Sequence, residues 1–373
     1  MKLKKITLTT GIFPPDIGGP ASFIPTFAEF LVQNGIEVDV ITLSDKIQDY
    51  KNLTYKVIAI SRKIKKPFRD ILVVKEIIKS AKTSDLIFSN TLAFESAIAS
   101  KISGKKLMQK IVGDLAWERA NTTQRFKGSL DEYQKARLCL KSNLTNIYRN
   151  FAIKRSDFII TPSEYLKNIV KIWDYPTEKI EVIYNAALLQ QSDKIIKKQK
   201  YRIVSVARLI PHKGFEAILK TLRKLNFDFE YIVIGDGFLK ISLENLSKEL
   251  KIDTKFIGNI SKKEVADYLK NSDLFILNSS YEGMPHVVLE AMQNSCPVIA
   301  SRVGGTPEVV KHNENGLLFK HNDIADLQKK IYSIKNDNIL RDKLIKNAKL
   351  FTKEFANVDK MFNRYINAIE KLI

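Results

Sequence analysis

The order in which strand-like and helix-like segments follow each other is the feature that most constrains the fold of this chain. Residues 4–13 are apolar and β-branched, and a loop rich in Pro and Gly follows them. Residues 23–35 carry apolar side chains at helical spacing and end at Gly35, and residues 36–43 form the next strand-like run. A helix between two strands is the unit of a parallel sheet with crossover helices. The sequence therefore predicts an α/β fold.

The same alternation restarts in the second half of the chain. Further strand-like runs lie at residues 85–90, 106–112, 157–163, 202–209, 229–237, 254–260, 273–280 and 297–301. Residues 182–202 are polar and rich in Lys, which is typical of a linker. We therefore expect two doubly wound, Rossmann-like domains, residues 1–186 and 187–355, each of roughly 180 residues. Residues 356–373 have a helical pattern.

The chain is strongly basic, with 61 Lys and Arg against 41 Asp and Glu and a formal net charge of +20. Both halves of the chain carry the excess. It suits an anionic membrane surface as a partner, or it reflects only solvated surface lysines. No motif typical of nucleic-acid recognition is present, so we expect no nucleic acid partner.

Cysteine, histidine and long apolar runs are scarce. Two Cys and four His are too few for a disulfide framework or a four-ligand zinc site. No run approaches the roughly 20 apolar residues of a membrane span, and the apolar part of the N-terminus is too short for a signal peptide. We therefore expect a cytoplasmic protein, and the membrane interpretation above places it on the inner face of the cell membrane.

Charged and glycine residues directly follow several of the predicted strands. In chain order these residues are Gly18, Gly19, Asp114, Arg208, Lys213 and Glu282. Ligands of open parallel sheets bind beyond the carboxyl ends of the strands. An Arg and a Lys together suit a diphosphate, whereas either alone is more often a solvated residue. The glycine pair is also consistent with a plain turn, and the Asp with a helix N-cap.

Two known phosphate-binding motifs are missing. The glycine loop at residues 18–19 lacks the G-x-G-x-x-G order of nicotinamide-binding domains, and no G-x-x-x-x-G-K-[ST] sequence occurs. The sequence therefore favours neither a dehydrogenase nor a P-loop ATPase.

The stretch "YEGMPHVVLEAM" contains two glutamates, Glu282 and Glu290, that flank the start of a predicted helix at about residues 285–295. The free N–H groups of the first helical turn carry a partial positive charge between the two carboxylates. A nucleotide-sugar has a matching layout, with a diphosphate between two groups that carry hydroxyls. Alternatively, Glu282 only complements the helix dipole and Glu290 is a surface residue.

Several of these segments together resemble a known family. Residues 281–319 look like the donor-site signature of the retaining glycosyltransferases of family four, which have the two-domain GT-B fold. "VARLIPHKG" (206–214) resembles the phosphate-binding segment of that family, with Ala207 where Gly is usual, and "PPDIGGPA" (14–21) resembles its glycine loop. "VIYNA" (182–186) is similar to its interdomain segment. The resemblance covers nearly the whole chain and is strongest in the second half.

This resemblance implies a role for each matching residue. Glu290 would hold the ribose of the donor, Glu282 the transferred sugar, and Arg208 with Lys213 the leaving diphosphate. The remaining donor-binding positions implied by the family are Gly18, Gly19, Asn259 and Ile260 (near the base), Gly283, Met284, Pro285 and Val287. The family also implies that the helix at 356–373 packs back on the first domain.

The acceptor side departs from the family pattern. Many relatives have a His just before the Asp, whereas this chain reads "VGDLAWE" at residues 112–118. We therefore expect Asp114, with Trp117 and Glu118, to handle the acceptor. The basic segment "SRKIKKPFR" (61–69) is a candidate for resting on a membrane that bears a lipid-linked acceptor.

The predicted reaction moves a hexose from a nucleoside-diphosphate sugar to an acceptor hydroxyl, in the synthesis of a lipid-linked or cell-surface glycan precursor. The family implies retention of configuration, and the absence of an Asp-x-Asp motif predicts that no catalytic metal and no further cofactor are required. Two alternatives remain open. One is a GT-B sugar-nucleotide epimerase, and the other is a non-enzymatic protein that binds polyanions or membranes.

Overall fold

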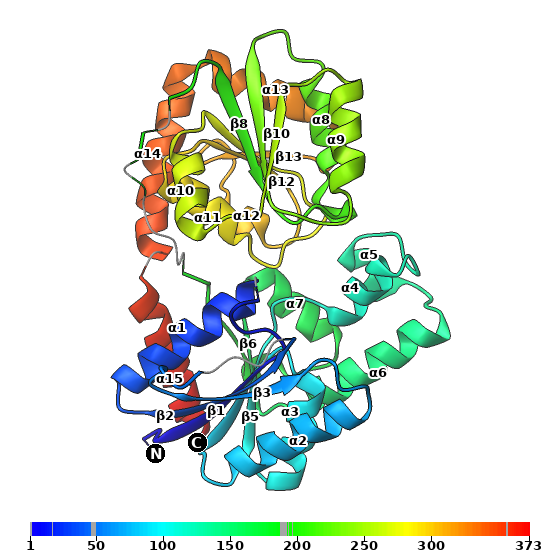
Figure 1. The fold of residues 1–373 in the computed structure, drawn as a ribbon, viewed down its shortest axis with the longest axis vertical. Coiled ribbons are helices and arrows are strands. Elements are labelled where there is room, and N and C mark those ends of the chain that lie inside the picture. Colours follow the sequence, from blue (N-terminus) through cyan, green and yellow to red (C-terminus); the bar gives the residue numbers. More distant parts are fainter. Residues whose placement is uncertain are drawn as a thin grey trace. The chain divides into compact units, whose positions relative to one another are not determined.

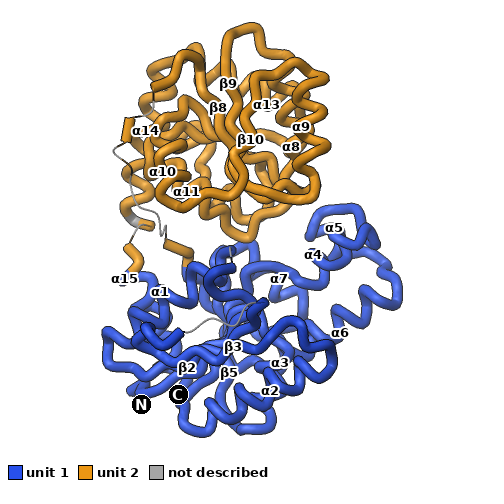
Figure 2. The backbone as a smooth tube through the Cα atoms, viewed as in Figure 1, with its two compact units in different colours: residues 1–183, 359–373 blue, residues 184–358 orange. Residues whose placement is uncertain are grey.

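The computed structural model describes residues 2–16, 18–45, 50–186, 192, 194–195, 197–355 and 357–373. The chain forms two compact units, coloured separately in Figure 2. Unit 1 comprises residues 1–183 and 359–373, and unit 2 comprises residues 184–358. Part of the predicted linker, residues 182–202, lies outside the described residues.

A parallel sheet of seven strands forms the centre of unit 1 (Figure 1). Its strands are β1 (Lys5–Thr10), β2 (Glu37–Ser44), β3 (Lys56–Ser61), β4 (Leu86–Asn90), β5 (Lys106–Lys110), β6 (Phe158–Thr161) and β7 (Ile180–Val182). They lie in the order β3-β2-β1-β4-β5-β6-β7, and all neighbouring pairs are parallel. The order reverses between β1 and β4, which is the topological switch point of a doubly wound sheet.

Helices cover both faces of this sheet. They are α1 (Gly19–Gln33), α2 (Phe68–Ala81), α3 (Ala93–Ser103), α4 (Leu115–Thr122), α5 (Leu130–Lys135), α6 (Leu140–Arg155), α7 (Glu164–Ile172), the 3-10 turn η1 (Thr177–Lys179) and α15 (Val358–Leu372). On one face α2, α3 and α6 share a buried cluster with the central strands. On the other face α1 and α15 pack through aromatic rings, with the Phe27 and Phe362 centroids 5.0 Å apart.

The central strand β1 shows how the sequence suits its place in the sheet. Both of its faces are buried, and Ile6 and Leu8 are fully covered. The hydroxyls of Thr7 and Thr9 on the opposite side bond to the hydroxyls of Ser80 (2.7 Å) and Ser96 (2.8 Å). A buried hydroxyl costs free energy unless it is hydrogen-bonded, so these pairs allow β-branched Thr in the core.

Unit 2 is built on a parallel sheet of six strands. They are β8 (Tyr201–Val206), β9 (Phe229–Ile234), β10 (Thr254–Gly258), β11 (Leu274–Leu277), β12 (Val298–Ser301) and β13 (Leu317–Phe319), in the order β10-β9-β8-β11-β12-β13. Its helices are the 3-10 turn η2 (Pro211–Lys213), α8 (Phe215–Leu222), α9 (Lys240–Glu249), α10 (Lys262–Lys270), α11 (His286–Gln293), α12 (Thr306–Val309), α13 (Ile324–Asn336) and α14 (Asn338–Phe355). Two buried clusters cover the two faces of the sheet, one with α10 and α11 and one with α8 and α13. The predicted fold class, two doubly wound parallel α/β domains, is confirmed.

Candidate active site

The switch point of unit 2 lies between β8 and β11, which are paired in the sheet. The loop after β8 and the loop after β11 therefore leave the same edge side by side. The two loops are hydrogen-bonded to each other: the backbone Ser280 N donates to His212 O (2.7 Å), and the side-chain Asn278 Nδ2 donates to Gly214 O (2.9 Å). Loops at a switch point are where open α/β sheets bind ligands.

Lys213 and Glu282 form an ion pair between these two loops. The distance from Lys213 Nζ to Glu282 Oε1 is 2.6 Å, and the two side chains are 15% and 14% exposed. Ser279 Oγ donates a second hydrogen bond to the same carboxylate oxygen (2.5 Å). Glu282 is thus held in one orientation, while the ammonium of Lys213 keeps donors for a further partner.

The backbone of Glu282 is fixed by a third loop, which follows β12. Gly305 N donates to Glu282 O (2.8 Å). Gly304 has a φ of +52°, and a Cβ there would lie 2.2 Å from Glu282 O. Glycine is therefore required at this position, both for the left-handed backbone and for the close approach. Elements from β8, β11 and β12 together position one carboxylate.

Arg208 lies on the same rim and is exposed. Its chain neighbours are anchored, because Ala207 N donates to Ile234 O (3.0 Å) and Leu209 N donates to Asp236 O (2.9 Å). The guanidinium itself makes no ion pair with any residue that the structure describes. An anchored backbone with an unengaged planar cation is suited to an anionic ligand.

Glu290 lies in α11, one helical turn beyond its start. The helix begins at His286, and Pro285 is the N-cap, so the predicted start at 285 is off by one residue. No side chain caps this helix end. Gly283, Met284 and Pro285 are buried and Val287 is half-buried.

The environment of Glu290 is unfavourable for a charge. Desolvation raises the pKa of its carboxyl to about 7, and the distant positive charge of Lys262 lowers it only partly. No hydrogen bond or ion pair joins the carboxyl to another described residue. A half-buried acid without a partner is costly in the folded protein, so the position suits one that a ligand completes.

Sequence reasoning missed the polar groups that hold this rim together. Ser279 orients Glu282, and the side chain of Asn278 bonds to both Gly214 O and Asn322 Oδ1 (2.8 Å). Burial, with a smaller contribution from Lys213, lowers the pKa of His212 to about 4. His212 is therefore neutral near pH 7. The only signal for these residues in the sequence is their place directly after the strands.

Two family models match consecutive parts of the chain. Residues 17–191 match the model described as glycosyltransferase family 4, and residues 189–351 match the model of glycosyl transferases group 1. The chain belongs to this family of glycosyltransferases. The resemblance that the sequence motifs indicated is confirmed.

Relatives and solved structures agree with this assignment. An uncharacterized glycosyltransferase of Methanocaldococcus jannaschii is 32% identical over 222 residues, which cover 59% of this chain and 61% of the relative. A Campylobacter jejuni enzyme named as an N-acetylgalactosaminyltransferase acting on a diphospho-undecaprenol is 26% identical over 59% of this chain and 63% of its own length. The chain thus spans about three fifths of these two relatives. The structure of Anabaena HepE in complex with UDP and glucose aligns with a TM-score of 0.81 at 20% identity, over 99% of this chain and all of HepE, and shows the GT-B fold.

The other donor-side residues predicted from the sequence lie directly after β10 in unit 2 and at the start of α1 in unit 1. Asn259 and Ile260 follow the edge strand β10, where Asn259 is exposed and Ile260 is half-buried. Gly18 is the N-cap of α1, and Gly19 is the exposed first residue of that helix. A Cβ on Gly19 would meet no atom within 4 Å, so its backbone is open to a ligand.

Asp114, the predicted acceptor-side residue of the glycosyltransferase, is fully buried in unit 1. It is the N-cap of α4, and its Oδ1 accepts from Ala116 N (2.9 Å) and Trp117 N (3.3 Å). Its Oδ2 accepts from Gln134 Nε2 (3.0 Å) and Arg149 Nη1 (2.6 Å). The helix-cap interpretation is what the structure shows, and a direct contact with the acceptor stays a prediction.

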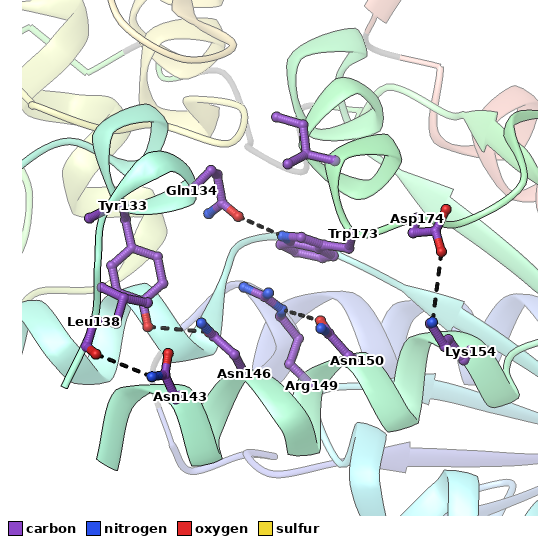
Figure 3. Close-up of a pocket in the computed structure, with 12 residues that line it drawn as sticks. Tyr133, Gln134, Leu138, Asn143, Asn146, Arg149, Asn150, Lys154, Trp173 and Asp174 are labelled. Atoms are coloured by element: carbon purple, nitrogen blue, oxygen red, sulfur yellow. Dashed lines mark hydrogen bonds and ion pairs between the residues drawn. The ribbon is translucent and has the colours of Figure 1, made fainter. Parts of the chain in front are cut away.

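A cavity of about 300 Å³ lies between α5, α6 and α7, and Arg149, the ion-pair partner of Asp114, is among the residues that line it (Figure 3). The guanidinium of Arg149 stacks 4.3 Å above the ring of Trp173, and the indole of Trp173 donates to Gln134 Oε1 (2.8 Å). Asp114 thus belongs to a network that fixes the arrangement of α4, α5 and α6. Trp117 is buried and donates its indole N–H to Gly128 O (3.0 Å), while Glu118 is half-buried.

No group of three or more His, Cys, Asp or Glu lies close enough to hold a metal ion among the residues that the structure describes. Within the same ranges, every helix is too short or too polar to cross a bilayer.

Proposed function

We propose that the chain transfers a hexose from a nucleoside-diphosphate sugar to a hydroxyl of a lipid-linked or cell-surface glycan precursor, with retention of configuration. The observation that carries this proposal is the Lys213–Glu282 pair at the switch point of unit 2, next to the unengaged Arg208. A cation for a diphosphate, Lys213, lies at ion-pair distance from a carboxylate for sugar hydroxyls, Glu282, and the loop that carries Lys213 also carries Arg208.

The donor class follows from the chemistry of these groups. The two cations suit the diphosphate, because a charged donor and a phosphate oxygen form strong hydrogen bonds. The partnerless Glu290 suits the two ribose hydroxyls, which would donate to its carboxylate and offset its desolvation. The solved structure of HepE contains UDP and glucose, which makes uridine the first base to test.

Catalysis by this site would be mainly electrostatic. The transition state of glycosyl transfer resembles an oxocarbenium ion, and negative charge develops on the leaving diphosphate. Arg208, Lys213 and the uncapped start of α11 would supply the positive charges and the dipole that stabilise such a leaving group. These same groups supply the charge that a metal ion supplies elsewhere, and they support the proposal of metal-independent transfer.

The acceptor proposal rests on relatives. The Campylobacter jejuni relative is named for a diphospho-undecaprenol acceptor, which is a lipid-linked sugar. No observation favours the epimerase, which would act without any acceptor.

The proposal is tested first by thermal shift with UDP-, GDP- and ADP-sugars, because a ligand stabilises the fold that it binds. We expect one nucleotide class to raise the melting temperature of the wild-type chain. Transfer is then measured with that donor and lipid-diphosphate acceptors, together with the anomeric configuration of the product by NMR. Absence of stabilisation by all three nucleotide classes would refute the donor site, and conversion of the donor without an acceptor would establish the epimerase instead.

A further inference from the structure

Helix α6 carries an apolar stripe on its solvent-facing side. The stripe consists of Leu140, Leu144, Ile147, Tyr148 and Phe151, which are 76%, 45%, 62%, 54% and 37% exposed. Spacings of three and four residues place them on one face of the helix. The residues of α6 that face the interior are different ones, Ser142, Ala152 and Ile153. We refer to these five exposed residues as the α6 stripe.

The stripe is separate from the polar face of the same helix. Asn143, Asn146 and Asn150 lie along α6 and line the cavity beside it (Figure 3). The ring of Phe94 on α3 packs edge-on against Tyr148 at 4.9 Å and lies 5.6 Å from Phe151. The stripe is therefore held in place by the layer beneath it.

The neighbouring helices extend the exposed apolar surface. α3 contacts both α2 and α6, and the three helices cover the same face of the sheet. Phe68 and Ile71 on α2 are 69% and 60% exposed, and Ile102 on α3 is 64% exposed. Of the 17 exposed large apolar residues among those described, nine lie on these three helices. Such a concentration marks an interaction site rather than scattered surface residues.

The three helices and the loop residues beside them carry a large share of the positive charge. Residues 61–81, 93–105 and 140–155 contain 13 Lys or Arg and three Asp or Glu, a formal net charge of +10. This is half of the net charge of the whole chain, which is +20. Lys63, Lys65 and Lys66 before α2, and Lys141 and Lys154 on α6, are all exposed.

We propose that the outer surface of α2, α3 and α6 docks on an anionic lipid bilayer, with the α6 stripe inserted at the headgroup level. An amphipathic helix with apolar residues on one face and Lys or Arg beside them binds in this way. The charge selects this partner over a second copy of the chain, because two surfaces that carry exposed lysines such as Lys63, Lys65 and Lys141 would repel each other. The proposal goes beyond the donor site and holds whatever sugar is transferred. The basic segment 61–69 is then one part of a larger docking surface, and α6 supplies the apolar part of that surface.

The test is co-sedimentation of the full chain with vesicles of phosphatidylcholine containing 30% phosphatidylglycerol, or of phosphatidylcholine alone. We compare the wild type with the double variant Leu144→Glu, Ile147→Glu. The matched control is Ile339→Glu, which changes an isoleucine of 86% exposure on α14 in unit 2. We expect the wild type and the control to bind only the anionic vesicles. The stripe variant should have a partition coefficient at least tenfold lower.

Each other outcome counts against the proposal. Equal binding by the stripe variant and the wild type, no binding by the wild type, or equal loss in the control would overturn it. Analytical ultracentrifugation of the same proteins tests self-association, and a wild-type dimer that the stripe variant dissociates, with no vesicle binding, would assign the surface to a second copy.

A second readout does not depend on the charged variants folding. In Ile147→Trp the new indole lies in the stripe, whereas Trp117 and Trp173 are buried. Docking predicts a blue shift of its emission on adding anionic vesicles and quenching by brominated lipid. An unchanged spectrum would contradict insertion. Stabilisation of all variants by the nucleotide-sugar is measured in parallel, so that failure of the docking surface and failure of the donor site are distinguished.

Discussion

Replacing Glu290 by Gln should stabilise the protein and weaken donor binding at the same time. Burial raises the pKa of the Glu290 carboxyl from 4.5 to about 7. Its charge is therefore less stable in the folded chain than in the unfolded chain. The folding stability of the chain with neutral Glu290 is fully present below pH 4.5, and part of it is lost as the carboxyl ionises and the pH rises through about 7. Glutamine has nearly the same shape as the neutral acid and cannot ionise.

The size of the effect follows from the shift. One pKa unit corresponds to about 1.4 kcal/mol, so ionising Glu290 costs the folded state about 3 kcal/mol at pH 8. In a domain the size of unit 2, this corresponds to a rise of about 6 °C or more in melting temperature for Glu290→Gln at pH 8. At pH 5 the carboxyl is mostly neutral in the folded protein, and the variant should melt close to the wild type.

The assay is differential scanning calorimetry of wild type and variant at pH 5 and pH 8 without ligand. Glu249→Gln, an exposed change on α9, is the matched control and should shift the melting temperature little at either pH. Equal melting temperatures for Glu290→Gln and wild type at pH 8 would refute the desolvation argument. A gain of the same size at pH 5 would show that the stabilisation has another origin.

Donor binding should have the opposite dependence. If the ribose hydroxyls bond to the ionised form of Glu290, the ionised fraction limits the affinity, and binding of the nucleotide-sugar tightens about tenfold between pH 6 and pH 8. Isothermal titration calorimetry measures this directly. In Glu290→Gln the affinity should be lower and should not change with pH. A pH-independent wild type would remove Glu290 from the donor site.

Three further predictions concern the rim of unit 2. Lys213→Ala and Glu282→Ala should each lower kcat/KM by about 100-fold or more. Because the pair acts as a unit, the double variant should lose less kcat/KM than the two single losses combined. Additive losses would show that the groups act separately. Arg208→Ala together with Lys213→Ala should weaken binding of free nucleoside diphosphate by about 3 kcal/mol, since each charged hydrogen bond contributes about 1.5 kcal/mol or more. An unchanged calorimetric affinity would exclude these two residues from diphosphate binding. Gly304→Ala should lower the melting temperature and abolish transfer, because the new Cβ would lie 2.2 Å from Glu282 O. Gly19→Ala should leave the melting temperature unchanged, because no atom lies within 4 Å of the position of its Cβ. Equal melting temperatures of the two variants would contradict this prediction.

Much of the fold could be predicted from the sequence because buried parallel strands leave a plain pattern. Strand β11 is covered on both faces and reads as a short, continuous apolar run between polar loops, whereas β1 reads as alternating apolar and β-branched Thr residues. The sequence does not predict the strand β3, which lies at the edge of the sheet and whose residues are mostly only half-buried. Helices α2 to α6 were also not assigned individually.

Helix α6 shows why such a segment is hard to interpret. Its apolar residues recur at helical spacing, which normally predicts the face that packs against a core. In this chain that face is exposed, and the face that packs carries Ser142, Ala152 and Ile153, of which one is a large apolar residue. Sequence periodicity identifies an apolar face but not what covers it.

The candidate site could be predicted as a neighbourhood but not as a set of contacts. Placing residues after strands identified Lys213 and Glu282, which are 69 residues apart. Their ion pair depends on the order of the strands, since β8 and β11 are neighbours only because the sheet reverses there. In the same way, the N-cap role of Asp114 was foreseen as an alternative, but its bond to Arg149, 35 residues later, depends on how α4 and α6 pack.

The ion pair between Lys213 and Glu282 also affects which ligands the rim can select. The carboxylate of Glu282 lies 2.6 Å from the ammonium of Lys213, so an isolated phosphate that binds Lys213 is also repelled by Glu282. A ligand that has hydroxyls alone can bond to Glu282 but offers no negative charge to Lys213. A molecule that has both a diphosphate and a polyhydroxylated ring offers negative charge to Lys213 and hydroxyl donors to Glu282. We therefore expect the rim to bind such a molecule in preference to simple phosphates.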